Sequence, residues 1–131
     1  KAIYEHLLNR VKASNLEQSV TVLSNQLATE VLSVLDIGVL ISSIEGTPNA
    51  VMEYMLYGLP VVASNHPGCI GLLEESPYLV PNDKKIIEQK LNELLSSTKK
   101  RRLEGDSNLE KIKKYNLPSY IGQLENIINK Y

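Results

Sequence analysis

Residues 37–64 read IGVLISSIEGTPNAVMEYMLYGLPVVAS, and they carry the clearest strand and helix signals in the chain. The apolar run at each end is typical of a strand that is buried on both faces, as in parallel sheets. Between the runs, Thr47 is a favoured helix N-cap, Pro48 suits the first helical position, and Gly58 suits the residue that follows the last turn. The stretch therefore predicts a strand, a helix over about residues 48–57 and a second strand.

The rest of the chain continues this alternation of strands and helices. Apolar residues at helical spacing predict the helices, and short β-branched or apolar runs predict the strands. Such an alternation implies a parallel sheet wrapped by helices, so we expect an α/β, Rossmann-like fold with a helical carboxyl-terminal tail. The further expected elements are strands at 20–23 and 78–80, helices at 3–12, 27–35, 98–115 and 118–131, a helical turn at 69–75, and a helix that follows an Asn82 or Asp83 cap.

The composition is that of one ordinary globular domain. The chain has 131 residues, 43% of them hydrophobic and 22% charged, so we expect a single packed domain over residues 1–131. A formal net charge of −1 excludes attraction of the whole domain to nucleic acid. No apolar run is long enough to span a bilayer, and a single cysteine, Cys69, fits a reducing, cytoplasmic setting. Because Lys1 opens directly into a helical pattern, we expect the chain to be a piece of a longer protein.

Only two residues between Ile37 and Leu73 are charged, Glu45 and Glu53, with seven residues between them. An ionised carboxylate among apolar side chains is costly unless it is paired or hydrogen-bonded. Ligands of parallel α/β folds bind outside the carboxyl ends of the strands, which is where we expect the loop of Glu45 and the helix of Glu53. We therefore favour a site for a polar ligand over the alternative that both carboxylates face solvent.

The start of the predicted helix suits a phosphate group. Free backbone N–H groups at Thr47, Asn49 and Ala50, together with the helix dipole, favour a phosphate or diphosphate, and Gly46 lets a ligand approach the backbone closely. At a rise of about 1.5 Å per residue, Glu53 lies roughly 7–9 Å from the helix start. This is a suitable reach from a diphosphate to a ribose, whose two hydroxyls one carboxylate can accept.

Residues 45–53, EGTPNAVME, and residues 58–64, GLPVVAS, together form a recognisable pattern. The pattern resembles the retaining, nucleotide-sugar-dependent glycosyltransferases of the GT-B fold, in family 4 and its relatives. The hallmark of that family is two glutamates separated by seven residues and followed by a Gly-x-Pro-Val-Val strand, and Ser42 fits the pattern as well. The resemblance covers essentially the whole chain, as the later part of the carboxyl-terminal, donor-binding domain, which is half of a GT-B fold.

The resemblance implies roles for individual residues. Glu45 would be the catalytic residue, contacting the donor sugar and supporting charge at the reacting centre, and Glu53 would hold the ribose. The nucleotide base would lie near residues 24–26. The residues implied in binding the donor sugar and phosphate are Ser42, Gly46, Thr47, Asn49 and Ala50.

The reaction implied by the resemblance moves a sugar from a nucleoside diphosphate to a glycan or lipid-linked acceptor, with retention, in surface polysaccharide biosynthesis. No cofactor or metal is implied, because backbone groups and upstream basic residues can stabilise the diphosphate. The first strand and helix of the donor domain and the amino-terminal acceptor domain would lie outside this chain, so the chain alone would be inactive. Two alternatives remain open, a GT-B-like sugar-nucleotide epimerase and a non-enzymatic nucleotide-sugar-binding or interaction module.

Two further groups of residues could have a function. His66 and Cys69 are two possible metal ligands without others nearby, so we favour an ordinary loop, with a sugar or phosphate contact by His66 as the alternative. Ten of the fourteen basic residues lie within residues 84–114, among them the run KKRR at residues 99–102. We expect a solvated helical surface with cations near helix ends, and the alternative is a peripheral contact with the inner face of an anionic membrane.

Overall fold

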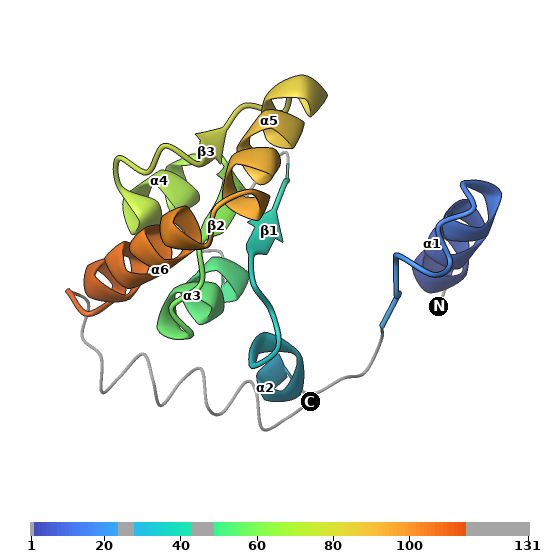
Figure 1. Cartoon of the computed structure of the whole chain (residues 1–131), viewed down its shortest axis with the longest axis horizontal. Coiled ribbons are helices and arrows are strands. Elements are labelled where there is room, and N and C mark those ends of the chain that lie inside the picture. The colour runs from blue at the N-terminus through green and yellow to red at the C-terminus, as the bar shows by residue number, and fades with distance from the viewer. Residues whose placement is uncertain (1, 24–27, 43–48, 115–131) are drawn as a thin grey trace.

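The structure, a computed structural model, describes residues 2–23, 28–42 and 49–114. These residues form an α/β fold, as predicted, with three parallel strands in the order β1-β2-β3 (Figure 1). Leu40 lies beside Ala63, and Ser64 lies beside Val80, so the carboxyl ends of the three strands meet at one edge of the sheet. The strands are β1 (Gly38–Leu40), β2 (Val61–Ser64) and β3 (Leu79–Val80).

Helices occur in the order that the sequence predicts; α3, α4 and α5 contact the sheet, whereas α1 lies apart from it (Figure 1). The helix expected at 118–131 lies outside the described residues. The cap of α5 is Asp83, whose carboxylate accepts hydrogen bonds from the backbone N–H groups of Lys85 at 2.9 Å and Ile86 at 3.3 Å. The helices are α1 (Ala2–Ala13), α2 (Ala28–Leu32), α3 (Asn49–Leu56), α4 (Pro67–Leu73), α5 (Lys84–Leu95) and α6 (Thr98–Ile112).

The prediction of a strand at residues 20–23 is wrong. This segment has no strand conformation, and the side chains of Val20 and Leu23 are 40% and 53% exposed. A β-branched run becomes a strand only where a neighbouring strand pairs with it. None of the three strands of the described residues pairs with residues 20–23, so their strand propensity is not realised.

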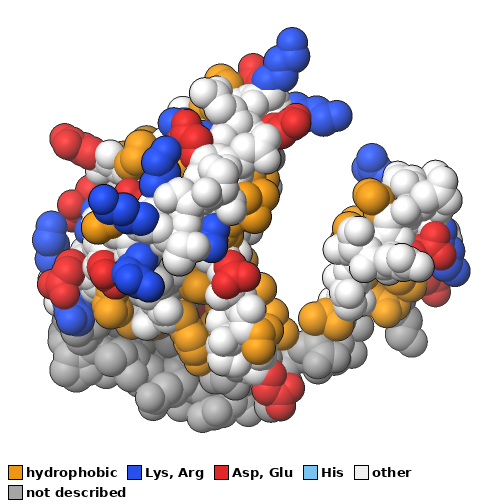
Figure 2. Space-filling view, viewed as in Figure 1, with side chains coloured by type: hydrophobic (Ala, Val, Ile, Leu, Met, Phe, Trp, Pro, Cys, Tyr) orange, Lys and Arg blue, Asp and Glu red, His pale blue; other side chains and the backbone are white. Residues whose placement is uncertain are grey.

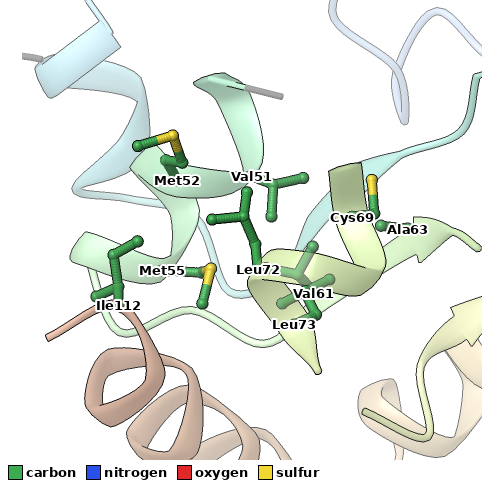
Figure 3. Close-up of a cluster of buried hydrophobic side chains, with 9 residues drawn as sticks. All are labelled: Val51, Met52, Met55, Val61, Ala63, Cys69, Leu72, Leu73 and Ile112. Atoms are coloured by element: carbon green, nitrogen blue, oxygen red, sulfur yellow. The ribbon is translucent and has the colours of Figure 1, made fainter. Parts of the chain in front are cut away.

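The sheet is covered on both faces, and β2 is buried at all four of its positions. Side chains alternate along a strand, so Val61 and Ala63 pack into one apolar cluster while Val62 packs into another. The second cluster contains Leu94 of α5. The first is built by α3, α4 and the end of α6, and its buried members, labelled in Figure 3, are Val51, Met52, Met55, Val61, Ala63, Cys69, Leu72, Leu73 and Ile112.

A close backbone contact joins α6 to the turn between α3 and β2. Gly58 in this turn has a φ of +66°, and a Cβ added to Gly105 of α6 would lie 2.1 Å from the Gly58 carbonyl oxygen. Only glycine at position 105 therefore lets the helix approach this closely. Beside it, Asn108 is fully buried and donates from Nδ2 to the Leu59 carbonyl oxygen at 2.9 Å.

Basic side chains satisfy the carboxyl-terminal ends of two helices, as expected. Arg101 donates from Nη1 to the carbonyl oxygens of Leu94 at 2.6 Å and Leu95 at 3.0 Å, at the end of α5. Lys111 donates from Nζ to the Leu73 carbonyl oxygen at 2.7 Å, at the end of α4. Both cations complement the negative end of a helix dipole. Elsewhere over α5 and α6, Figure 2 shows basic side chains mixed with acidic ones.

Candidate functional site

Four polar residues meet at the carboxyl edge of the sheet, where ligands of parallel α/β folds bind. Ser42 follows β1, Ser64 is the last residue of β2, His66 follows β2, and Asn82 follows β3. Hydrogen bonds connect all four residues, although the pairs are 18 to 40 positions apart in the sequence. We call these four residues the strand-end network.

Both backbone groups of Ser42 are held by side chains of the strand-end network. The Ser42 N–H donates to Ser64 Oγ at 2.9 Å, and the Ser64 hydroxyl donates to Asn82 Oδ1 at 3.0 Å. The Ser42 carbonyl oxygen accepts from Asn82 Nδ2 at 3.3 Å and from His66 Nε2. Because a carbonyl oxygen can only accept, Nε2 of His66 must carry a proton.

His66 and Asn82 each stand at a junction between a strand and a helix. His66 is the N-cap residue of α4, yet its side chain makes no capping hydrogen bond and reaches back to Ser42 instead. Asn82 precedes the cap of α5, which Asp83 supplies, and it also reaches back to Ser42. Two potential capping residues are thus used to hold the end of β1.

The Ser42 hydroxyl is a buried polar group that the network does not use. Its Oγ atom has no hydrogen-bond partner among residues 2–23, 28–42 and 49–114, whereas the Ser64 hydroxyl both accepts and donates. A buried hydroxyl without a partner costs free energy. The Ser42 hydroxyl can therefore gain from a polar group brought to this edge.

Glu53 lies one turn inside α3, the helix that follows the carboxyl end of β1. Val51, Met52 and Met55 bury one face of α3 in the apolar cluster, and Glu53 is half-buried beside them. Burial raises the pKa of the Glu53 carboxyl above its ordinary value. Among the described residues, this carboxylate has neither a hydrogen bond nor an ion pair to offset that burial.

A glycine lets α3 lie close against β1. A Cβ added to Gly38 would lie 2.4 Å from ring carbons of Tyr54, so the ring of Tyr54 packs directly on the β1 backbone. The Tyr54 hydroxyl donates to the Val39 carbonyl oxygen at 3.4 Å. Since Tyr54 is adjacent to Glu53 in α3, this contact also fixes where the backbone of Glu53 lies relative to β1.

A groove of about 570 Å³ adjoins the strand-end network. It runs between the end of β1 and α5, and Asn82 belongs both to its wall and to the network. Its lining is mostly apolar, so it suits a flat or apolar part of a ligand whose polar part meets the network. The lining residues are Ile41, Asn82, Lys84, Ile87, Glu88, Leu91, Asn92 and Leu95.

Four residues of the predicted site lie within the described part of the chain. Ser42 belongs to the strand-end network, Asn49 and Ala50 form the first turn of α3, and Glu53 follows one turn later. The predicted residues Glu45, Gly46 and Thr47, and the base region at 24–26, lie outside the described residues, so their roles stay predictions.

Sequence reasoning did not single out Ser64 or Asn82, and it gave His66 only as an alternative. Each of these residues ends or follows a buried apolar run. A polar residue at the end of a predicted strand is the sequence signal that could have identified them. Which polar residues meet depends on the order and register of the strands, and a single sequence does not show either.

No group of three or more His, Cys, Asp or Glu side chains within the described part of the chain is arranged to hold a metal ion. Cys69 is buried in α4, and Nε2 of His66 donates to the Ser42 carbonyl oxygen. Across residues 2–23, 28–42 and 49–114, no helix is long and apolar enough to cross a membrane.

Comparison with known proteins gives one match. Residues 3–97 match the family model described as "Glycosyl transferases group 1", which is well over half of the chain. No curated protein and no solved structure matches. The matched residues include all three strands, the strand-end network and Glu53.

Proposed function

This chain belongs to the glycosyl transferases of group 1, and on that premise we propose that it binds a nucleoside diphosphate sugar at the carboxyl edge of its sheet. The chain is then the donor-binding half of a GT-B enzyme, which works with an acceptor domain outside residues 1–131. The enzyme transfers the sugar with retention to a glycan or lipid-linked acceptor in the cytoplasm, and we expect surface polysaccharide biosynthesis as its pathway.

The observation that carries the proposal is the environment of Glu53. Burial also raises the pKa of Glu104, but two neighbours lower it. These are Lys111 and the Ser76 hydroxyl, whose Oγ lies 3.4 Å from Glu104 Oε2. Glu53 has no such compensation among the described residues. A half-buried carboxylate without a partner is costly in the free protein and is satisfied when a ligand supplies donors. The two hydroxyls of a ribose are such donors.

The first turn of α3 supports a place for the diphosphate. Asn49 and Ala50 open the helix, and the N–H groups of a first turn have no partners within the helix. These groups and the helix dipole would stabilise the negative charge that develops on the departing diphosphate. Gly46 and Thr47 precede this turn in the sequence and would add contacts to the donor.

At the sugar, we assign the catalytic role to Glu45. Its carboxylate would support the positive charge that develops at the anomeric carbon as the bond to the diphosphate breaks. The Ser42 hydroxyl, buried and without a partner among the described residues, would contact the sugar or a phosphate. Nothing in this assignment requires a metal ion or a cofactor.

The test is a calorimetric titration of the full-length protein with UDP, GDP and ADP and with their sugar conjugates. We expect one nucleotide to bind, and we expect Glu53→Gln to weaken that binding at least tenfold, because the ribose hydroxyls lose an ionised acceptor. The matched control is Glu104→Gln, which changes another half-buried carboxylate and should leave the affinity unchanged. Equal affinity in wild type and Glu53→Gln would contradict the ribose role.

Three exposed cations of α6, Lys99, Lys100 and Arg102, support a second part of the proposal, a peripheral contact with an anionic membrane surface. Neutralising all three should lower sedimentation of the full-length protein with liposomes that contain an anionic lipid. Binding to neutral liposomes is the control. Unchanged sedimentation with the anionic liposomes would mean that these cations belong to a solvated surface and do not contact a membrane.

A further inference from the structure

The groove between the end of β1 and α5 extends along the helix, and its two ends differ in chemistry. Asn82 and Lys84 line the end beside the strand-end network, and Leu95 lines the other end, where α5 stops. At a rise of about 1.5 Å per residue, the wall of helix from Lys84 to Leu95 is about 16 Å long. Ile41, which follows β1, belongs to the opposite wall. The groove therefore suits a long, thin ligand that lies along α5.

Aliphatic side chains form most of the lining of this groove. Ile87 and Leu91 are partly buried against the apolar cluster that contains Val62. Leu95 and Ile41 remain 63% and 37% exposed, and covering apolar surface of this kind is favourable. No aromatic ring belongs to the lining that the described residues provide, so the groove offers hydrocarbon contacts and not a stacking surface for a base.

The far end of the groove lies beside the basic start of α6. Asn92 lines both the groove and a neighbouring pocket, to which Lys100 also belongs. Lys99, Lys100 and Arg102 are exposed, and they are the cations that the proposed function places against an anionic membrane surface. A hydrocarbon chain that leaves the groove past Leu95 would enter such a membrane directly.

N–H donors lie at the end of the groove that meets the strand-end network. Asn82 is exposed and belongs to both the network and the groove wall. Lys84 is exposed and has no ion pair among the described residues. Glu88 lines the groove one turn further along α5, so the charged groups of the lining balance. An amide and an ammonium group can both donate to the oxygen atoms of a phosphate or a sugar, so this end suits the polar head of a lipid.

We propose that the groove between β1 and α5 binds the hydrocarbon chain of a lipid-linked acceptor, with the polar head of that lipid at Asn82 and Lys84. The inference rests on the proposed function, in which the acceptor is a glycan or a lipid-linked molecule. It selects the lipid-linked acceptor and gives the donor-binding half of the enzyme a part in holding it. The head of the acceptor then lies at the same edge of the sheet as the donor.

The experiment uses the full-length protein and geranylgeranyl phosphate, which is one hydrocarbon chain with a phosphate head. Calorimetric titration, at lipid concentrations too low for micelles, measures the affinity. Inorganic phosphate is the control for the head without the chain. Leu95→Gln makes one end of the groove polar. Leu103→Gln is the matched control, because Leu103 is 60% exposed on α6 and does not line the groove.

We expect geranylgeranyl phosphate to bind, and inorganic phosphate to show no binding at the same concentrations, because the chain supplies most of the contact. Leu95→Gln should weaken the binding of the lipid roughly tenfold, since an amide replaces apolar surface that the chain would cover. Leu103→Gln should keep the affinity of the wild type within about twofold, a change small enough to be surface chemistry alone.

Other occupants of the groove would give other results. If another part of the enzyme fills it, the lipid does not bind, and Leu95→Gln lowers the free energy of unfolding in urea while Leu103→Gln does not. If a second copy fills it, sedimentation shows a dimer that Leu95→Gln dissociates. Either result overturns the inference, as does an equal loss of lipid affinity in the two variants.

The nucleotide titration of the wild type separates this inference from the proposed function. A protein that binds a nucleotide but not geranylgeranyl phosphate keeps the proposed function and loses the inference. A protein that binds the lipid but none of the nucleotides contradicts the proposed function, and the assignment of the lipid as acceptor is overturned with it.

Discussion

Two asparagines in this molecule form the same kind of bond in opposite surroundings. Asn82 donates from Nδ2 to the Ser42 carbonyl oxygen at the edge of the sheet, and its side chain is exposed. Asn108 donates from Nδ2 to the Leu59 carbonyl oxygen beneath α6, and it is fully buried. Each bond spans at least 40 residues of sequence, so each fixes two distant segments together.

The difference between the two asparagines lies in what replaces the bond when it is lost. Water can reach the Ser42 end of the exposed pair, whereas the Leu59 carbonyl oxygen would be left buried and unsatisfied. The contact under α6 should therefore control the free energy of unfolding. The contact at the strand ends should instead control the local geometry of the strand-end network, which solvent reaches.

The largest effect on stability should come from Gly105→Ala in the contact under α6. The new Cβ would lie 2.1 Å from the Gly58 carbonyl oxygen, and neither backbone can move without disturbing a helix or a turn. We expect a loss of about 3 kcal/mol in the free energy of unfolding, measured by urea denaturation. Gly71→Ala is the control, since its Cβ would have no atom within 4 Å. Equal stability of the two variants would show that α6 can shift freely.

A direct test of the comparison replaces each asparagine in turn. Asn108→Ala should lower the free energy of unfolding by about 2 kcal/mol, because the Leu59 carbonyl oxygen loses its donor in a buried position. Asn82→Ala should lower it by only about 0.5–1 kcal/mol, because water replaces the amide at the Ser42 carbonyl oxygen and only the Ser64 hydroxyl loses an acceptor. Urea denaturation of both variants measures the difference. Similar losses in the two variants would mean that exposure does not separate these bonds.

Arg101→Met in α6 should lower the free energy of unfolding by less than Gly105→Ala or Asn108→Ala does. It removes the cation that binds the Leu94 and Leu95 carbonyl oxygens at the end of α5. We expect the free energy of unfolding to fall by about 0.5–1 kcal/mol, and added salt should make this loss smaller. Arg102→Met, at an exposed neighbouring position, is the control for the loss of one charge. The same loss in both variants would assign the effect to net charge alone.

The smallest effect, and one of opposite sign, is expected for Glu53→Gln. Burial raises the pKa of Glu53 above its ordinary value of 4.5, so the folded state keeps a proton that the unfolded state has already released. Stability of the wild type should therefore fall as pH rises from 4.5 through the raised pKa of the folded state. The amide does not titrate, so the variant should be more stable at neutral pH, by a few tenths of a kcal/mol after solvent screening.

Thermal denaturation of wild type and Glu53→Gln at pH 4 and pH 7 measures this effect. The stability gained by the variant should be present at pH 7 and absent at pH 4, where the carboxyl is protonated in both states. A variant that is less stable than wild type at pH 7 would show that Glu53 has a stabilising partner. Such a result would remove the reason for treating it as a ligand-binding group.

Local sequence signals were sufficient for most of the fold. The β-branched run at 61–64 became β2 with the expected bounds, and the Asp83 cap fixed the start of α5. The run at 20–23 had similar strand propensity but found no neighbouring strand among the described residues. Propensity and capping act within a few residues, whereas pairing needs a partner that may be far away in sequence or outside it.

The candidate site also has one feature that the sequence predicts and one that it does not. The partial burial of Glu53 was predictable, because a lone carboxylate in an apolar helix is visible in the sequence. The meeting of Ser64 and Asn82 was not predictable, because it depends on Ser64 lying beside Val80 across the sheet. Contacts of this kind appear only when the order and register of the strands are known.

The complete burial of β2 has a consequence for motion. All four residues of this strand are covered, between β1 and β3 and between two apolar clusters. Segments buried in this way open only with much of the domain, so amide hydrogen exchange should be slowest in β2 and much faster at the exposed residue Asn82. The strand-end network thus has a base at Ser64 that moves only with the sheet and a rim at Asn82 that solvent reaches.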